Sequence, residues 1–215
     1  MRTQTRTERR KQRTSEAILD AAEPLFLEHG FHQVSVQQIA DEADVALGTL
    51  YAHFGSKEGI YAALVDRAME IDEQYMTEAH SLETPEARIA AVADAYLRFY
   101  RDHPGAFRLF VFGNHPGDPS PGEVPEATSR VARRAEDEMT RLAAAIEEWV
   151  ESGTIRPVDP KRAAVFLWAA WNGLIAMHMR RDSLAVADAE FEALLNEARQ
   201  ILTYGLLADE ARHSP

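Results

Sequence analysis

The segment Leu47–Phe54 carries side chains that could contact a nucleic acid. If the segment is helical, Leu50 and Phe54 lie four residues apart and share an inward face. The outward face is then formed by small, hydroxyl, phenol and imidazole groups: Gly48, Thr49, Tyr51 and His53. A solvated helix face usually carries Glu and Lys, whereas these groups suit phosphate oxygens and base edges. The segment is a candidate recognition helix, with a plain connecting helix as the alternative.

Two preceding helices are expected to position this segment. A helix with the apolar stripe Ile18, Leu19, Ala22, Leu25 and Phe26 starts at a Thr14/Ser15 cap and stops at Gly30. Pro24 should kink it or remove one backbone bond.

Ser35 and Gln38 form a capping-box pattern that opens a second, short helix. The residues Asp44-Val45-Ala46 are too few for a loop and predict a tight turn into Leu47–Phe54, which ends at Gly55. Three helices in this order fit a helix-turn-helix, whose last helix enters the major groove.

The remaining chain also shows helical periodicity, punctuated by Pro and Gly. Helices are expected from Ser56 to about His80, Pro85 to Arg101, Pro104 to Gly113, Pro125 to Ser152, Pro160 to about Arg181, and Asp188 to about Leu207. We therefore predict an all-α fold of about nine helices. Residues 1–56 would form a basic arm and DNA-binding domain, and residues 57–215 a larger helical effector-binding and dimerisation domain.

The charge is distributed unevenly along the chain. The net charge is −12, yet residues 1–15 hold Arg2, Arg6, Arg9, Arg10, Lys11 and Arg13 against Glu8, a sum of +5. Residues 58–215 hold 16 basic and 27 acidic residues, a sum of −11. A basic end on an acidic body indicates that a polyanion meets one end only, the alternative being a solvated tail.

Composition and motifs exclude several other classes. The chain has no cysteine, so thiolate metal sites, disulfides and cysteine nucleophiles are absent. Its histidines form no metal-binding motif, and no phosphate loop or nucleophile elbow occurs. We expect no cofactor and no metal, and an enzyme is only a remote alternative. The basic N-terminus leads into no apolar segment, and the uncharged run Ala163–Met179 is short for a bilayer span. A cytoplasmic location without membrane contact is expected.

Several ordered motifs resemble the tetracycline-repressor (TetR) family. They are Ala17–Ala22 (AILDAA), Leu25-Phe26, Gly30-Phe31, Val36–Ala40 (VQQIA), Gly48–Phe54 (GTLYAHF) and Ser56–Glu58 (SKE), within residues 10–65. The resemblance implies a dimeric DNA-binding regulator, chiefly a repressor, with a helical body that varies widely between relatives.

The resemblance also implies a set of DNA contacts. Thr49 would meet a base edge or phosphate, while Tyr51, His53 and Lys57 would bind phosphates. The full set is Arg13, Ser35, Gln37, Leu47, Gly48, Thr49, Tyr51, His53 and Lys57. Many relatives have Gly in the turn and a Ser-Lys pair before the recognition glycine, where this chain has Asp44, Ala46 and Leu47. The resemblance therefore does not specify which bases are read, and Leu47 would contact a thymine methyl instead of the lysine reading a base.

A two-fold homodimer through the last two long helices is the next implication, because one reading head covers half a palindromic operator. Their apolar stripes are wider than one monomer core requires. The expected interface residues are Phe166, Trp171, Leu174, Ile175, His178, Phe191, Leu194, Leu195, Ala198, Ile201 and Leu202. Ordinary core stripes are the alternative.

The middle helices concentrate aromatic and thioether side chains, which indicates a largely apolar effector site or, alternatively, plain core. The candidates are Tyr96, Phe99, Phe107, Phe110, Met139, Trp149, Trp168 and Asn172. By resemblance, the effector would move the helix from Pro104, which packs near the helix from Ser56, and release operator DNA. A constitutive or partner-controlled DNA-binding dimer remains the alternative.

Overall fold

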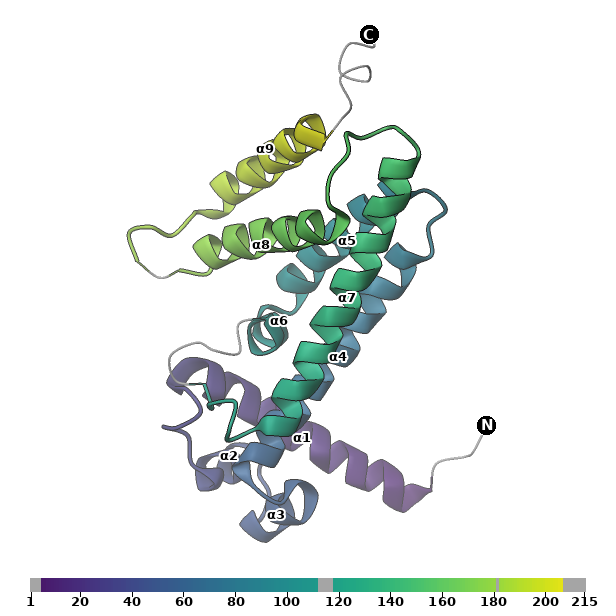
Figure 1. Ribbon diagram of the computed structural model, residues 1–215. Helices are drawn as coiled ribbons and strands as arrows, with labels where there is room; N and C mark the ends of the chain where they lie inside the picture. The colour runs from purple at the N-terminus through teal and green to yellow at the C-terminus, as the bar shows by residue number, and fades with distance from the viewer. Residues whose placement is uncertain (1–4, 112–117, 181, 207–215) are drawn as a thin grey trace. The chain divides into compact units, whose positions relative to one another are not determined.

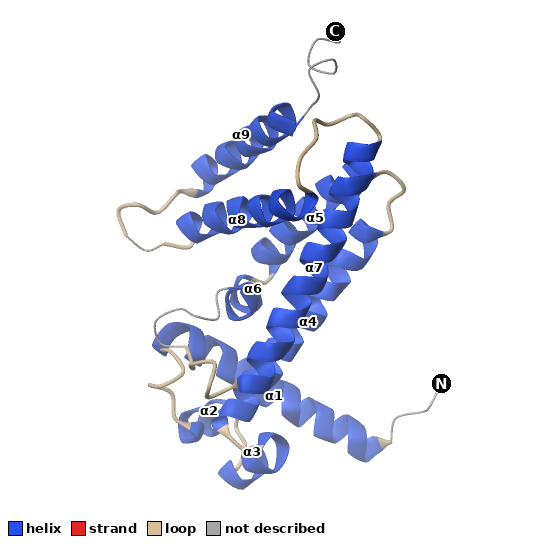
Figure 2. Ribbon diagram, viewed as in Figure 1, coloured by secondary structure: helices blue, strands red, loops and turns tan. Residues whose placement is uncertain are grey.

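Nine helices are formed by the residues that the structure, a computed structural model, describes: 5–111, 118–180 and 182–206. They are α1 (Arg6–His29), α2 (Val36–Glu42), α3 (Leu47–Phe54), α4 (Lys57–His80), α5 (Pro85–Asp102), α6 (Pro104–Val111), α7 (Pro125–Glu151), α8 (Pro160–His178) and α9 (Asp188–Leu206). Figure 1 traces their order, and Figure 2 shows helices joined by loops. The predicted all-α architecture is confirmed.

These helices are shared between two compact units. The first comprises residues 1–77 and 95–134, and the second comprises residues 78–94 and 135–215. Helices α4, α5 and α7 contribute residues to both units. The predicted boundary after residue 56 divides the chain by function, into a DNA-binding domain and an effector-binding and dimerisation domain. The two units are defined by compactness alone, so the functional boundary stays a prediction.

Helix α1 starts earlier than predicted. Its N-cap is Thr5, whose hydroxyl accepts the Glu8 N–H at 3.2 Å while the Glu8 carboxylate accepts the Thr5 N–H at 2.6 Å. The predicted start at Thr14/Ser15 is wrong because this capping box opens the helix more than two turns before it. Thr14 instead donates to the Arg10 carbonyl at 3.1 Å, as an interior residue. The basic residues from Arg6 onward therefore belong to a helix.

Pro24 lies inside α1 without ending it, and the helix stops at Gly30 with φ 83°. A proline has no N–H, so the carbonyl of Asp20 lacks its helical donor. The side chain of Asp20 accepts a bond from Arg67 of α4 at 2.6 Å, and Glu23 binds the same guanidinium. Arg67 thus ties this part of α1 to α4.

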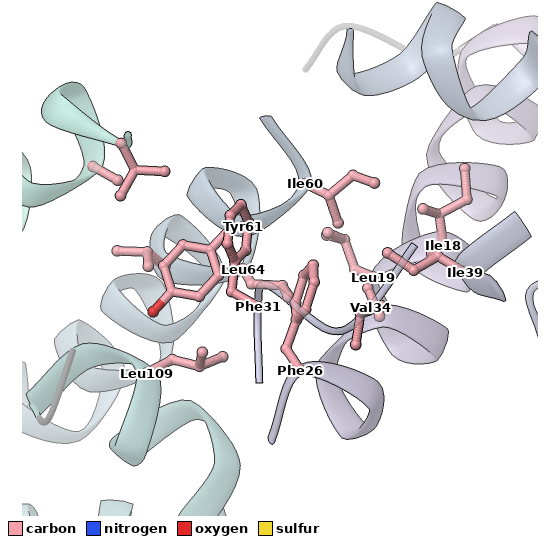
Figure 3. Close-up of a cluster of buried hydrophobic side chains, with 14 of the residues drawn as sticks. Ile18, Leu19, Phe26, Phe31, Val34, Ile39, Ile60, Tyr61, Leu64 and Leu109 are labelled. Atoms are coloured by element: carbon pink, nitrogen blue, oxygen red, sulfur yellow. The ribbon is translucent and has the colours of Figure 1, made fainter. Parts of the chain in front are cut away.

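The core of the first unit surrounds an aromatic trio (Figure 3). The rings of Phe26, Phe31 and Tyr61 lie 5.5–5.8 Å apart, centroid to centroid. Aliphatic side chains of α1, α2 and α4 pack around them, and α6 adds Leu109. Because α1, α2 and α4 share this core, they hold α3 through Leu50, which is fully buried.

The second unit has its own core and an adjacent pair of contacting helices, α8 and α9. Leu142, Ile146 and Trp149 of α7 pack there with Ala164 and Leu167 of α8. Helix α8 ends at His178, slightly before the predicted end near Arg181. The predicted ends of α6 near Gly113 and of α9 near Leu207 lie outside the described residues.

Candidate nucleic-acid interface

The turn between α2 and α3 has a left-handed residue at Asp44, with φ 52°. Aspartate tolerates this region better than most side chains, which explains how the turn forms here without glycine. The Val45 N–H donates to the Ala40 carbonyl at 3.0 Å and closes the turn. The predicted tight turn is thus present, and it sets the direction in which α3 leaves α2.

Helix α3 presents its outer face to solvent. Its bounds, Leu47–Phe54, coincide with the predicted segment, and Gly55 ends it with φ 75°. Tyr51 is 46% exposed, Gly48 is exposed, and Leu47, Thr49 and His53 are half-buried. Ala46 precedes the helix without a side-chain cap bond. The first N–H groups of α3 therefore receive no side-chain acceptor from their N-cap residue.

Nothing inside the described chain requires a glycine at position 48. A Cβ added there meets no atom within 4 Å, and the residue has ordinary helical φ. Glycine inside a helix costs about 1 kcal/mol relative to alanine. The absence of an internal reason for Gly48 is consistent with close approach by an external surface.

Two of the predicted contacts at the start of α2 have local partners. Ser35 forms the predicted capping box: its hydroxyl accepts the Gln38 N–H at 3.2 Å. Gln37 donates from Nε2 to Asp41 at 2.7 Å. Both side chains are exposed, so each is accessible to a neighbouring molecule.

Lys57 binds the protein's own backbone, and its predicted contact with a phosphate stays a prediction. Its Nζ donates to the carbonyls of Phe31 at 2.8 Å and Val34 at 3.0 Å, and lies 4.4 Å from the Phe31 ring centroid. The ammonium thereby fastens the segment between α1 and α2 to the start of α4. It supports the helix-turn-helix from behind, because two of its three donors are bound to the protein's own backbone.

Ser15 is a site residue that sequence reasoning treated only as a cap. Its Oγ lies 2.9 Å from Nδ1 of His53, so it joins α1 to α3. The available signal was spacing: Ser15 precedes Leu19, Ala22 and Phe26 by four, seven and eleven residues and thus continues the buried stripe of α1.

The basic residues of α1 are exposed on one side of the helix. Arg6, Arg9, Arg10 and Arg13 follow the spacing i, i+3, i+4, i+7, which places them on one face. The buried stripe that includes Ile18, Leu19 and Ala22 lies on the opposite face. The arginines therefore point away from the core of the helix-turn-helix.

The candidate effector residues fall into separate groups. In the first unit, Phe107 of α6 packs on Tyr96 and Phe99 of α5, with centroids 5.0 and 5.5 Å apart. In the second unit, Trp149 belongs to the core, Met139 is partly buried against it, and Trp168 is 38% exposed. Asn172 donates to the Trp168 carbonyl at 3.0 Å. The side chain of Phe110 lies outside the described part of the chain.

Helix α6 reaches α1 directly. A Cβ at Gly105 would lie 2.4 Å from Glu23 Oε1 and 2.7 Å from Leu27 Cδ1, so only glycine permits this approach without a shift. Arg108 donates to the Leu27 carbonyl at 2.6 Å. Since Leu109 also enters the core with Tyr61 of α4, α6 contacts both helices that position the recognition segment.

The candidate dimer residues divide by exposure. Phe166 and Ile201 are 62% and 63% exposed, whereas Leu174, His178, Leu194, Ala198 and Leu202 are half-buried. Trp171, Ile175, Phe191 and Leu195 are buried within the chain itself, because α8 and α9 pack on each other. His178 stacks on Phe191 at 4.1 Å between ring centroids. These buried side chains therefore offer little surface to a second copy.

The described residues contain no cluster of three or more His, Asp or Glu side chains suited to a metal ion. Among the same residues, every helix is too short or too polar to cross a bilayer.

The fold and the exposed face of α3 define a helix-turn-helix DNA-binding regulator.

Family models match both parts of the chain. Residues 18–64 match bacterial regulatory proteins of the tetR family, and residues 89–198 match a tetracyclin repressor-like C-terminal domain. The chain belongs to the TetR family of transcriptional regulators.

Individual relatives agree with this assignment. The HTH-type transcriptional regulator RutR of Escherichia coli (strain K12) is 30% identical over 158 residues, 72% of this chain and 70% of RutR. NalD, the secondary repressor of the MexAB-OprM multidrug efflux pump in Pseudomonas aeruginosa, is 25% identical, with a TM-score of 0.71 over 92% of this chain and 98% of NalD. AibR in complex with isovaleryl coenzyme A and operator DNA shares the fold, at 19% identity and a TM-score of 0.66 over 86% and 97% of the two chains.

Proposed function

We propose that this regulator is a homodimeric repressor that binds a palindromic operator through α3 and leaves it when a largely apolar small molecule binds. The observation that carries the proposal is the outer face of α3. Gly48, Thr49 and Tyr51 are accessible there, while Leu50 anchors the helix from beneath. A helix held in this way fits the major groove, with Tyr51 and His53 toward phosphates and Thr49 toward a base edge or phosphate.

The basic face of α1 supplies contacts of a second kind. Arg6, Arg9, Arg10 and Arg13 point away from the base-reading elements, so they bind phosphates outside the half-site and read no sequence. Each phosphate neutralised adds about 0.9 to the slope of log affinity against log salt. The acidic remainder of the chain opposes DNA contact elsewhere.

The dimer forms through the exposed apolar side chains of α8 and α9. Phe166 and Ile201 are the most exposed residues of this surface, and the half-buried Leu174, Leu194, Ala198 and Leu202 complete it. A symmetric pair then presents two copies of α3 about one DNA turn apart, ~34–36 Å. This arrangement supports recognition of a palindrome.

Release requires a ligand that prefers the non-binding conformation. The cluster of Tyr96, Phe99 and Phe107 supports an effector site at α6, since Phe107 belongs to that helix and packs on two rings of α5. Gly105 and Arg108 would transmit the movement to α1, and Leu109 to α4. NalD is described as a repressor and AibR is described with a coenzyme A ester, which agrees with control by ligand.

The proposal is tested by selecting bound DNA from a random pool at fixed salt concentration. A palindrome is expected, and Thr49→Ala or Tyr51→Ala is expected to weaken it at least several-fold, about 1 kcal/mol or more per lost contact. Thr140→Ala, at an exposed threonine of α7, is the matched control. Selection without a palindrome, or full affinity in both α3 variants, contradicts the proposal.

Ligand control is tested separately on the selected operator. Purified protein is titrated with apolar and cationic compounds while operator occupancy is followed by fluorescence anisotropy. Release by one compound supports the effector mechanism. Operator binding that persists across the panel favours the constitutive dimer.

A further inference from the structure

The bond between Ser15 and His53 couples α1 to the recognition helix. Ser15 Oγ and His53 Nδ1 are 2.9 Å apart, and both residues are partly buried. Thr14, the neighbouring hydroxyl, is different, because it donates to the Arg10 carbonyl within its own helix. Within the described chain, Nδ1 of His53 is the only hydrogen-bond partner of the Ser15 hydroxyl. The bond therefore runs either from the Ser15 hydroxyl to Nδ1 or from Nδ1–H to the Ser15 oxygen, according to the tautomer of His53.

An imidazole that accepts a bond at Nδ1 carries its proton on Nε2 while it is neutral. The Nε2–H is then a donor on the far side of the ring. In the opposite arrangement, Nδ1–H would donate to Ser15 and the Nε2 lone pair would face the DNA, where a phosphate anion repels it. Operator binding thus selects the arrangement in which Ser15 donates.

Building on the DNA contact assigned to His53 above, we propose that Ser15 is a positioning residue for the phosphate contact of the recognition helix. Its hydroxyl fixes the plane and the tautomer of His53. The ring thereby donates Nε2–H to a DNA phosphate at neutral pH, without first taking up a proton. At lower pH the imidazolium donates from both nitrogens, and Ser15 then accepts from Nδ1.

The charged surroundings of His53 decide how the contact responds to pH. Lys57 is bound to backbone carbonyls, Glu8 to Thr5 and Asp41 to Gln37. Helix α3 carries no other charged side chain. The elements around α3 carry further charged residues: Glu8, Lys11 and Glu16 on α1, Asp41 and Glu42 on α2, Asp44 in the turn, and Lys57 and Glu58 on α4. No described ion pair joins any of them to His53. A positive charge on the His53 ring would therefore attract the DNA phosphate and not a carboxylate of the protein.

The experiment measures operator affinity at about pH 8 and about pH 5.5, on either side of the range in which ordinary histidines titrate. Ser15→Ala is expected to lower the affinity about fivefold per half-site at the higher pH, the value of one hydrogen bond. The deficit is expected to fall below about twofold at the lower pH, because the charged ring attracts phosphate in either orientation. Ser15→Thr restores the affinity, and Thr14→Ala leaves it unchanged.

A double-mutant cycle separates this role from a packing role. If Ser15 acts through His53, Ser15→Ala has no further effect in a His53→Ala background. An equal loss in both backgrounds, or a Ser15→Ala deficit that is the same at both pH values, overturns the proposal. Chemical denaturation of each variant confirms that the compared proteins are folded.

Failure of the inference is distinguishable from failure of the proposed function. If His53→Ala is silent while Thr49→Ala weakens binding, the role of Ser15 is refuted and operator reading by α3 stands. If neither variant affects operator binding, the proposed use of α3 is itself refuted.

Discussion

Lys57 holds the segment between α1 and α2 against the first turn of α4. Lys57→Met leaves the Phe31 and Val34 carbonyls without their donor, and we expect a loss of about 1–2 kcal/mol in the free energy of unfolding. The measurement is urea denaturation followed by circular dichroism. Lys11→Met, at an exposed lysine of α1, is the control and is expected to be nearly neutral. Unchanged stability of Lys57→Met would contradict this structural role.

Single residues also show which parts of the site could be predicted from sequence. Leu50 and Gly55 define α3 by local spacing and local backbone conformation, so its bounds were predicted correctly. The partners of Lys57 and Ser15 lie 23 to 38 residues away in the chain. Such pairings depend on how the helices pack, which local patterns do not specify. A family motif likewise gives a residue's position without its hydrogen-bond partners.

At the scale of helices, a capping pattern indicates a helix start most clearly where apolar residues follow it at helical spacing. The capping box of Ser35 and Gln38 precedes such a stripe and is predicted correctly, whereas the one at Thr5 and Glu8 lies in a basic stretch without one. The separation of α8 and α9 surfaces into buried and exposed residues was also unpredictable. Both helices carry broad apolar stripes, and only their mutual packing shows which side remains outside.

The first turns of α1 are expected to depend on pH. Hydrogen bonds from the backbone and hydroxyl of Thr5 lower the pKa of Glu8 below its ordinary value. A lowered pKa in the folded state means that the cap is fully formed above the ordinary glutamate pKa and is lost as the pH falls through the lowered one. The protection factors of the amides of residues 8–10, which are corrected for the intrinsic pH dependence of exchange, are therefore expected to fall in acid. In Glu8→Ala they should be low already at neutral pH.

The matched control for the cap is Glu28→Ala, at an exposed glutamate near the other end of α1. It leaves the Thr5 cap intact and is expected to preserve the amide protection of residues 8–10 at neutral pH. Slow exchange in Glu8→Ala would contradict the capping role.

For the whole molecule, the exposed apolar side chains of α8 and α9 predict the state of assembly. Phe166→Glu combined with Ile201→Glu places two charges per copy on this surface, and we expect a monomer because burying unpaired charges is costly. Sedimentation velocity measures the change. Leu82→Glu, at a 40% exposed leucine before α5, is the control.

The double variant is also expected to lose operator affinity while its helix content is unchanged, because one recognition helix covers only half of a palindrome. A double variant that remains dimeric would show that another surface forms the dimer.

The helical state of the basic N-terminal residues bears on the kinetics of the DNA binding proposed for them. A helix rises 1.5 Å per residue, so Arg6 lies at a fixed distance of about 14 Å from Ser15 along the axis of α1. An unstructured tail would capture DNA over a wide range of separations. If the arginines bind phosphates as proposed above, a stiff rod holds them at one distance from the docked body, so we expect them to prolong residence on DNA more than they speed the search.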